Sequence, residues 1–216
     1  EAYAQNTDLV GWLKIDKLKM DFPILQTDND SYYLKRSFTH RYTDLGNPFM
    51  AHANSIEPLD RNSIIYGHST RSSDKIFSKL FDYRTTRGFI NNPIIEFNTI
   101  YHDYKWKVYA VFITNATTAE DNGYFFNYVW TNISEASFEQ YIAELDSRKL
   151  YTTGVDIKPT DKILTLSTCL YEFDNARLVV VARMVRDGES EEVDTSLVKT
   201  NPNPRYPQAW YDKDKK

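Results

Sequence analysis

The run Asp161-Lys-Ile-Leu-Thr-Leu-Ser-Thr-Cys169 is followed by the polar stretch 170–176, Leu-Tyr-Glu-Phe-Asp-Asn-Ala, and then by Arg177-Leu-Val-Val-Val-Ala-Arg183. The first and third segments are rich in β-branched and aliphatic residues, which is typical of strands, and the polar stretch between them is typical of a loop. The pattern therefore predicts strand, loop, strand. A hairpin-like return would bring Cys169, at the end of one strand, and Arg177, at the start of the next, to the same rim.

Short β-type runs recur along the rest of the chain, each bounded by Asp, Asn, Pro or Gly. The predicted strands are Phe22–Gln26, Ser63–Tyr66, Ile94–Phe97, Trp106–Thr114, Ile163–Ser167 and Leu178–Val185. Their spacing favours a barrel or a sandwich over a parallel α/β sheet. We expect a mainly β protein with added helices.

Two helices are predicted within this pattern, over Ser73–Tyr83 and from Ser134 to Leu145. Apolar residues recur at helical spacing in both segments, and Ser134 is a favourable N-cap. The apolar faces are Ile76, Phe77, Leu80 and Phe81 in the first helix and Phe138, Tyr141, Ile142 and Leu145 in the second. Both faces are expected to pack on the core.

The two ends of the chain differ from the middle. A helical lead is expected over residues 1–10, with Gly11 marking the passage to a strand, and an extended tail over 187–216, whose prolines exclude a central strand. Tyr206, Trp210 and Tyr211 are expected to lay this tail over the barrel. With no internal repeat and no sharp change of composition, residues 1–216 are interpreted as a single domain.

Composition excludes several function classes. The chain has 216 residues and a net charge of −4, with scattered basic residues, so nucleic acid is not an expected partner. The single cysteine rules out an internal disulfide, and no run approaches the roughly 20 apolar residues that span a bilayer. One cysteine and four dispersed histidines offer no metal-ligand spacing, and no glycine-rich phosphate loop is present. No metal and no cofactor are expected.

The lone thiol has two readings. A free cysteine is often a buried, inert hydrophobe, but Cys169 sits at a strand end near a guanidinium, where the thiolate is favoured. A nucleophilic thiol needs a proton acceptor, and His68 also follows an apolar strand, with His52 as its rival. Arg177 is suited to stabilising an oxyanion, although a surface ion pair is an equal alternative from its position alone.

Three motifs together resemble one family. Tyr66-Gly-His68, Thr165-Leu-Ser-Thr-Cys169 and Arg177-Leu-Val-Val-Val-Ala182 closely resemble the sortases, specifically their class B, and the resemblance extends from Val10 to Val185. Other matching features are Gly-Trp-Leu-Lys-Ile near the N-terminus, Phe-Pro-Ile-Leu-Gln, Asp-Ser-Tyr-Tyr-Leu and the helix after Ser134. The resemblance implies an eight-stranded sortase-type barrel without a calcium requirement, on the extracellular face of the cell membrane and anchored by an N-terminal segment.

The resemblance also implies roles for individual residues. It makes Cys169 the nucleophile, His68 the acid/base and Arg177 the cation beside the oxyanion. The implied substrate groove is lined by Leu34, Tyr66, Ser167 and Thr168. Some class B enzymes have asparagine where this chain has Asp30, and the expected specificity loop, 116–129, carries no pattern that transfers.

The implied reaction is transpeptidation of a sorting signal of the Asn-Pro-x-Thr-Asn or Pro-x-Thr-Gly type, cut after Thr and joined to a peptidoglycan amine through a thioester. A pilin polymerase using a lysine acceptor is the alternative within the family, and a monomer is expected. A non-catalytic barrel that binds wall polymer through its 16 tyrosines is a further alternative. A papain-like hydrolase fits less well, because it places cysteine early and histidine late, the reverse of the order here.

Overall fold

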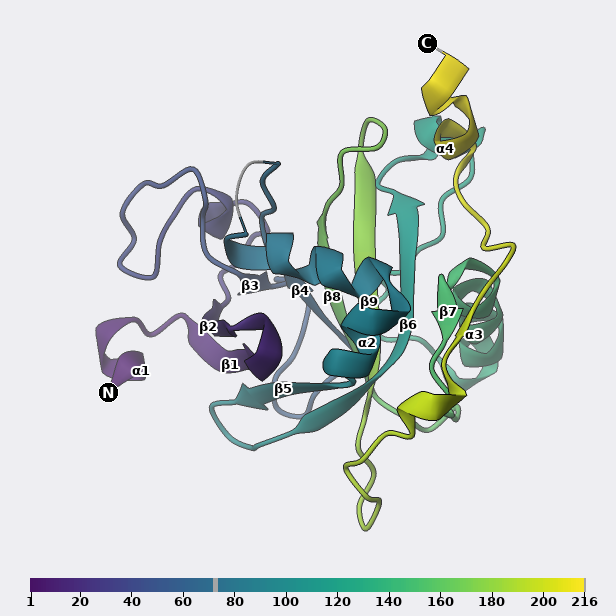
Figure 1. The fold of residues 1–216 in the computed structure, drawn as a ribbon. Helices are drawn as coiled ribbons and strands as arrows, with labels where there is room; N and C mark the ends of the chain where they lie inside the picture. Colours follow the sequence, from purple (N-terminus) through teal and green to yellow (C-terminus); the bar gives the residue numbers. More distant parts are fainter. Residues whose placement is uncertain (72–73, 216) are drawn as a thin grey trace.

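The computed structural model describes residues 1–71 and 74–215, and eight strands within them close into a barrel (Figure 1). These strands are β1 (Leu9–Ile15), β2 (Met20–Leu25), β3 (Phe49–Met50), β4 (Asn62–Tyr66), β5 (Ile94–Thr99), β6 (Lys105–Asn115), β8 (Ile163–Cys169) and β9 (Ala176–Met184). Their order around the barrel is β1-β2-β3-β4-β8-β9-β6-β5. The expected eight-stranded barrel is confirmed, and the six predicted strands correspond to β2, β4, β5, β6, β8 and β9.

Strands β6, β8 and β9 are buried on both faces, which explains their continuous apolar runs. Leu166, Leu178 and Val180 belong to the cluster inside the barrel, whereas Val179 and Val181 belong to a second cluster outside it. Helix α3 (Glu135–Arg148) covers that outer cluster, and Figure 1 shows it against this side of the barrel. The predicted apolar face packs as expected, and the Ser134 side chain accepts a hydrogen bond from the Ser137 amide as the N-cap.

The first predicted helix, Ser73–Tyr83, is wrong in type and extent, and Ser73 itself lies outside the described residues. The chain instead forms the 3-10 helix η3 (Ile76–Arg84) and then α2 (Thr86–Asn91). The Thr85 hydroxyl accepts a hydrogen bond from the Gly88 amide and so caps α2, which starts a new helix there. A Cβ at position 88 would collide with the Asp82 carbonyl, so only glycine permits this tight corner.

The N-terminal lead is also shorter than predicted. Helix α1 covers only Ala2–Gln5, and β1 already begins at Leu9. Gly11 lies within β1 and does not mark its start. A Cβ there would collide with the Asn98 carbonyl and lie 2.7 Å from the Phe97 ring of the neighbouring strand β5, so this glycine serves a close strand approach.

The tail after residue 186 runs along the outside of the barrel toward the end where β8 and β9 are joined (Figure 1). It is only partly extended. Its regular elements are η5 (Thr195–Leu197), β10 (Lys199–Thr200), α4 (Gln208–Asp212) and η6 (Lys213–Lys215), and β10 pairs with β7 (Tyr151–Thr152). The Tyr206 and Trp210 rings stack 4.3 Å apart and pack on the core, as predicted, while Tyr211 is exposed.

The start of the tail is fastened by ion pairs to a buried guanidinium. Arg183 is 1% exposed, and its Nη2 donates to Glu189 Oε1 at 2.8 Å and to Asp156 Oδ1 at 3.1 Å. The hydrogen bonds from Arg183 hold the pKa of Glu189 well below its usual value of 4.5. Both carboxylates must therefore stay ionised for Arg183 to remain paired.

Acid should weaken this anchor. A carboxyl whose pKa is lower in the folded than in the unfolded chain adds stability above the unfolded value, and that stability is lost as pH falls through the folded value. We expect thermal stability to be flat from neutrality to about pH 5 and to fall below it. Glu189→Gln should lower the free energy of unfolding by about 2 kcal/mol near neutrality and reduce the loss of stability below pH 5, which melting curves across pH would measure. If the variant lost stability below pH 5 as steeply as wild type, the ion pair between Glu189 and Arg183 would not be its cause.

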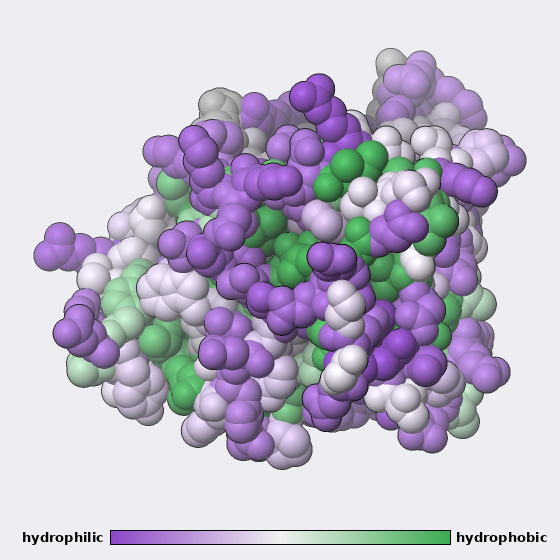
Figure 2. Space-filling model, turned by 60° about the horizontal axis from the view of Figure 1, so that its bottom comes forward, coloured by the Kyte–Doolittle hydropathy of each residue, from purple (hydrophilic) through white to green (hydrophobic). Residues whose placement is uncertain are grey.

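Apolar residues on the surface and in the helices are distributed as follows in the described part of the chain. On the face shown in Figure 2, apolar residues are interrupted by hydrophilic ones, without one continuous apolar patch in the part described. Among the described residues, no helix is both long and apolar enough to span a membrane.

Candidate active site

Parallel pairing of β4 with β8 places His68 beside Cys169. Tyr66 lies opposite Ser167, so the residues that follow leave the barrel at the same end. The Thr168 hydroxyl donates to the Gly67 carbonyl at 2.7 Å, and the Ser69 hydroxyl donates to the Cys169 carbonyl at 2.6 Å. These two bonds fix the histidine segment against the cysteine segment.

Antiparallel pairing of β8 with β9 places Arg177 directly opposite Cys169. Side chains of directly opposed residues project from the same face of the sheet, with Cβ atoms about 5 Å apart. Both side chains are only partly buried, so the thiol is not in the core. The predicted hairpin thus brings sulfur and guanidinium to one rim.

All seven residues predicted for the site line a single cavity of about 220 Å³. They are His68, Cys169 and Arg177 together with the four predicted groove residues, Leu34, Tyr66, Ser167 and Thr168. Leu34 comes from the 3-10 helix η2 (Tyr32–Leu34), and the others from the ends of β4, β8 and β9. A thiol, an imidazole and a guanidinium therefore share one space, which is an arrangement that can support acyl transfer.

The His68 ring is oriented by the main chain of η2. Its Nε2 lies 2.8 Å from the Leu34 carbonyl oxygen, which can only accept, so Nε2 carries a proton. Nδ1 is therefore the nitrogen left to exchange a proton with a substrate. Of the four histidines, all within the described residues, only His68 lines the cavity; the rival His52 lies against Asp30, with 3.1 Å between Nδ1 and Oδ2.

The groove tyrosines are hydrogen-bonding groups and not bases. Burial raises the pKa of Tyr66, and the neighbouring Tyr128 and Asp30 add to the shift while Arg177 opposes it. Burial likewise raises the pKa of Tyr128, whose hydroxyl lies 3.1 Å from Ser167 Oγ. Both hydroxyls thus stay protonated at neutral pH and shape the groove wall behind the thiol.

Besides Gly67, which also lines the cavity, three lining or supporting residues were not among the predicted site residues. Asp30 and Phe49 line the cavity, and Tyr128 supports Ser167 from the loop 116–129. Asp30 stood out only as a departure from the asparagine of some class B enzymes. Phe49 gave no signal, because a two-residue strand has no readable period, and Tyr128 reaches the site through contacts across 39 positions of sequence.

Comparisons with known proteins agree with this geometry. A family model, the sortase domain, matches residues 13–185. The chain is 31% identical over 183 residues to sortase B of Listeria monocytogenes serovar 1/2a (strain ATCC BAA-679 / EGD-e), covering 83% of this chain and 71% of the relative. It is 30% identical over 184 residues to sortase B of Staphylococcus aureus (strain NCTC 8325 / PS 47), covering 84% and 72%.

Solved structures show the same likeness. A Staphylococcus aureus sortase B–substrate complex superposes with a TM-score of 0.76 at 28% identity, covering 86% of this chain and 83% of that one. The structure of Clostridium perfringens sortase B superposes with a TM-score of 0.73 at 28% sequence identity, covering 86% of this chain and 98% of that one. A barrel with cysteine, histidine and arginine at one rim is thus found in a chain whose relatives are sortases of class B. The chain belongs to the sortase family, as a cysteine transpeptidase similar to sortase B.

Proposed function

We propose that Cys169 is the nucleophile of this transpeptidase, that His68 is its acid/base and that Arg177 stabilises the oxyanion. The observation that carries the proposal is that all three line one cavity, with Cys169 and Arg177 directly opposed across β8 and β9. A preorganised cation next to the attacked carbonyl stabilises the negative charge that develops on its oxygen. The alternative of a non-catalytic barrel with an inert core thiol loses its basis, because the thiol is partly exposed.

In the first half-reaction the Cys169 thiolate attacks the threonine carbonyl of a sorting signal. A C–S bond forms, Arg177 holds the oxyanion, and His68 as imidazolium gives its Nδ1 proton to the leaving amine as the C–N bond breaks. The products are a thioester on Cys169, a released peptide and neutral His68. In the second half-reaction a new amine attacks the thioester carbon, His68 takes a proton from that amine, and the thiolate leaves.

The acyl donor is proposed to be a peptide of the Asn-Pro-x-Thr-Asn or Pro-x-Thr-Gly type. It would lie in the cavity formed by Leu34, Tyr66, Ser167 and Thr168, and the solved Staphylococcus aureus sortase B–substrate complex supports peptide binding by a relative. The acceptor is proposed to be a peptidoglycan cross-bridge amine at the extracellular face of the cell membrane, in line with the surface role of the family. A pilin lysine is the second candidate acceptor.

A panel of sorting peptides, incubated with and without an amine, tests the proposal. Mass spectrometry should find cleavage after Thr, a thioester adduct on the chain, and a new amide when triglycine or Nα-acetyl-lysine amide is added. Joining to triglycine alone favours wall attachment, and joining to the lysine amine alone favours pilin assembly. Absence of cleavage across the panel would contradict the proposed substrate class.

A further inference from the structure

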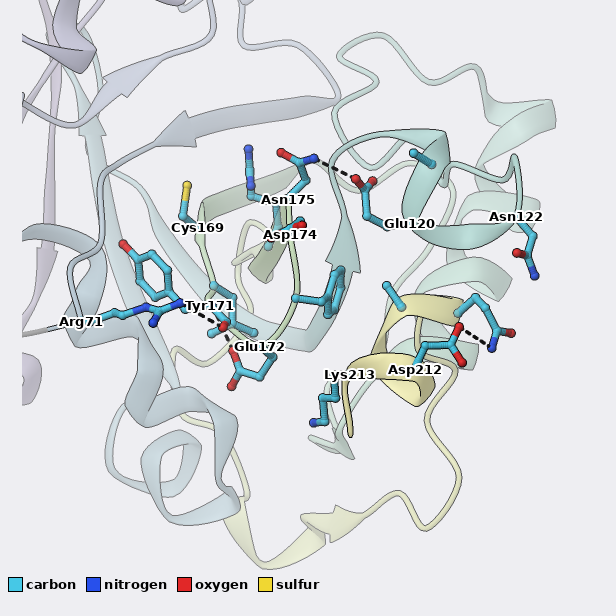
Figure 3. Close-up of a pocket in the computed structure, with 16 residues that line it drawn as sticks. Arg71, Glu120, Asn122, Cys169, Tyr171, Glu172, Asp174, Asn175, Asp212 and Lys213 are labelled. Carbon is cyan, nitrogen blue, oxygen red and sulfur yellow. Dashed lines mark hydrogen bonds between the residues drawn. The ribbon is translucent and has the colours of Figure 1, made fainter. Parts of the chain in front are cut away.

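A second and larger cavity, of about 760 Å³, also opens at Cys169 and Arg177. It shares only these two lining residues with the groove described above. Its walls come from the loop 170–175, the 3-10 helix η4 (Thr118–Asp121) and the C-terminal helix α4 with the start of η6. Figure 3 shows Cys169 near one side of this space and Asn122 and Asp212 on the other. The nucleophile therefore stands where two separate cavities meet.

The α4 wall belongs to a segment outside the region matched by the sortase family model, which ends at residue 185. That segment is fixed by specific contacts. Asp121 of η4 accepts hydrogen bonds from Arg205 Nη2 at 2.8 Å and from the Gln208 amide at 3.0 Å, and the Arg205 guanidinium lies 4.8 Å from the centre of the Tyr124 ring. The tail is thus part of the rim beside the thiol.

Helix η4, to which the tail is fixed, also contacts the loop that connects Cys169 to Arg177. Glu120, next to the anchor Asp121, accepts a hydrogen bond from Asn175 Nδ2 at 2.8 Å, which Figure 3 draws as a dashed line. Asn175 has a φ of +57°, in the left-handed region that asparagine enters more readily than most residues, and it lies two positions before Arg177. Tail, η4 and loop therefore form one hydrogen-bonded wall.

Charged side chains of both signs line this wall, and two of its carboxylates can receive an ammonium group. Four carboxylates line the cavity: Glu120, Glu172, Asp174 and Asp212. Apart from Arg177, its cations are Arg71, which lies 4.8 Å from the centre of the Tyr171 ring, and Lys213, which lies 3.2 Å from that of Trp210. Two of the carboxylates are already ion-paired, Glu172 with Arg84 at 2.6 Å and Asp212 with Lys215 at 2.7 Å. Glu120 and Asp174 form no ion pair among the described residues, so they are the carboxylates that an entering ammonium group can pair with.

A transpeptidase must bring two peptides to one thiol: the acyl donor, whose carbonyl forms the thioester, and then the peptide whose amine attacks that thioester. The smaller cavity contains His68 and the proposed donor groove. We propose that the larger cavity is the acceptor site, that it takes a peptide with a free primary amine, and that the C-terminal helix α4 supplies the wall that selects it. This inference rests on the proposed transpeptidation and assigns the tail a role in choosing the second substrate.

Ala209→Trp tests the inference by filling the cavity from α4, since Ala209 lines it. Tyr211→Trp is the matched control, because Tyr211 lies on the same helix, is exposed and is not a lining residue. The donor is a sorting peptide that ends one residue after the scissile bond, so that the leaving group occupies little of the cavity. Triglycine is the acceptor, and hydrolysis and amide formation are followed separately.

We expect Ala209→Trp to raise the KM for triglycine about tenfold and to leave cleavage without acceptor within about twofold of wild type, while Tyr211→Trp changes neither. Asp212→Lys should raise the same KM by about fivefold through charge repulsion with the ammonium group, without adding an aromatic ring. Melting temperatures close to wild type confirm that the variants are folded.

An unchanged KM for triglycine in both Ala209→Trp and Asp212→Lys would overturn the acceptor site. The same conclusion would follow if these variants lost cleavage without acceptor to the same degree as amide formation with triglycine. Either result leaves the proposed function intact as long as wild-type protein still cleaves the donor. Failure of the wild type to form a thioester would instead overturn the transpeptidation mechanism itself. The two failures are therefore distinguishable in one set of reactions.

Discussion

Cys169→Ala should lower turnover of a sorting peptide by at least about 10⁴-fold, because the covalent intermediate can no longer form. It should also abolish the thioester adduct and remove all labelling by a thiol reagent, since the chain has one cysteine. Native wild-type protein should label with a stoichiometry near one, because the thiol is partly exposed at the junction of two cavities. Peptide cleavage followed by mass spectrometry measures the first effect.

Cys169→Ser is the matched control for this loss, because it keeps the size of the side chain and replaces only the sulfur. A hydroxyl at this position is a far weaker nucleophile without a strong base, so this variant should be nearly as inactive as the alanine. Both variants should melt near the wild-type temperature, since the side chain is not part of the core clusters. Retained cleavage by folded Cys169→Ala would contradict covalent catalysis by this residue.

The sequence predicted that Cys169, His68 and Arg177 lie at one rim, and the structure places them there because each lies at or just beyond the end of a strand. The apolar run before Cys169 and the one after Arg177 predicted two strands joined by a short loop, and their antiparallel pairing places the two side chains opposite each other. His68 was predicted by the same logic, and it lies two residues after the end of β4. The local sequence pattern was therefore enough to predict the positions of these three residues, because strand ends determine them.

Features that depend on contacts between distant segments were not predictable in this way. Gly11 was interpreted as the passage from the helical lead to a strand, but it allows β1 to approach β5 closely, and that neighbour is known only from the fold. The tail looked merely extended, whereas its anchor joins Arg205 to Asp121 across 84 positions of sequence. Both features depend on contacts with residues far away in the sequence, which a local pattern of apolar and polar residues does not reveal.

Arg177→Gln should lower kcat by about 10² to 10³-fold with a smaller change in KM, because the oxyanion forms only in the transition state. Arg177 lies opposite Cys169 and lines both cavities, so its guanidinium lies on the side of the proposed reacting carbonyl in both half-reactions. Arg177→Lys keeps the charge but not the planar fork of donors, so it should recover only part of the loss. Steady-state kinetics on a sorting peptide would separate kcat from KM.

The matched control is Arg87→Gln, which makes the same chemical change at an exposed residue of α2 that lines neither cavity. It should leave both kinetic constants unchanged. If Arg177→Gln raised KM alone and spared kcat, the guanidinium would bind the substrate equally in ground and transition states, and the oxyanion role would be wrong. The oxyanion role predicts a lower kcat in Arg177→Gln, partial recovery of kcat in Arg177→Lys, and a melting temperature close to wild type in both variants. A purely structural arginine would instead lower the melting temperature together with kcat.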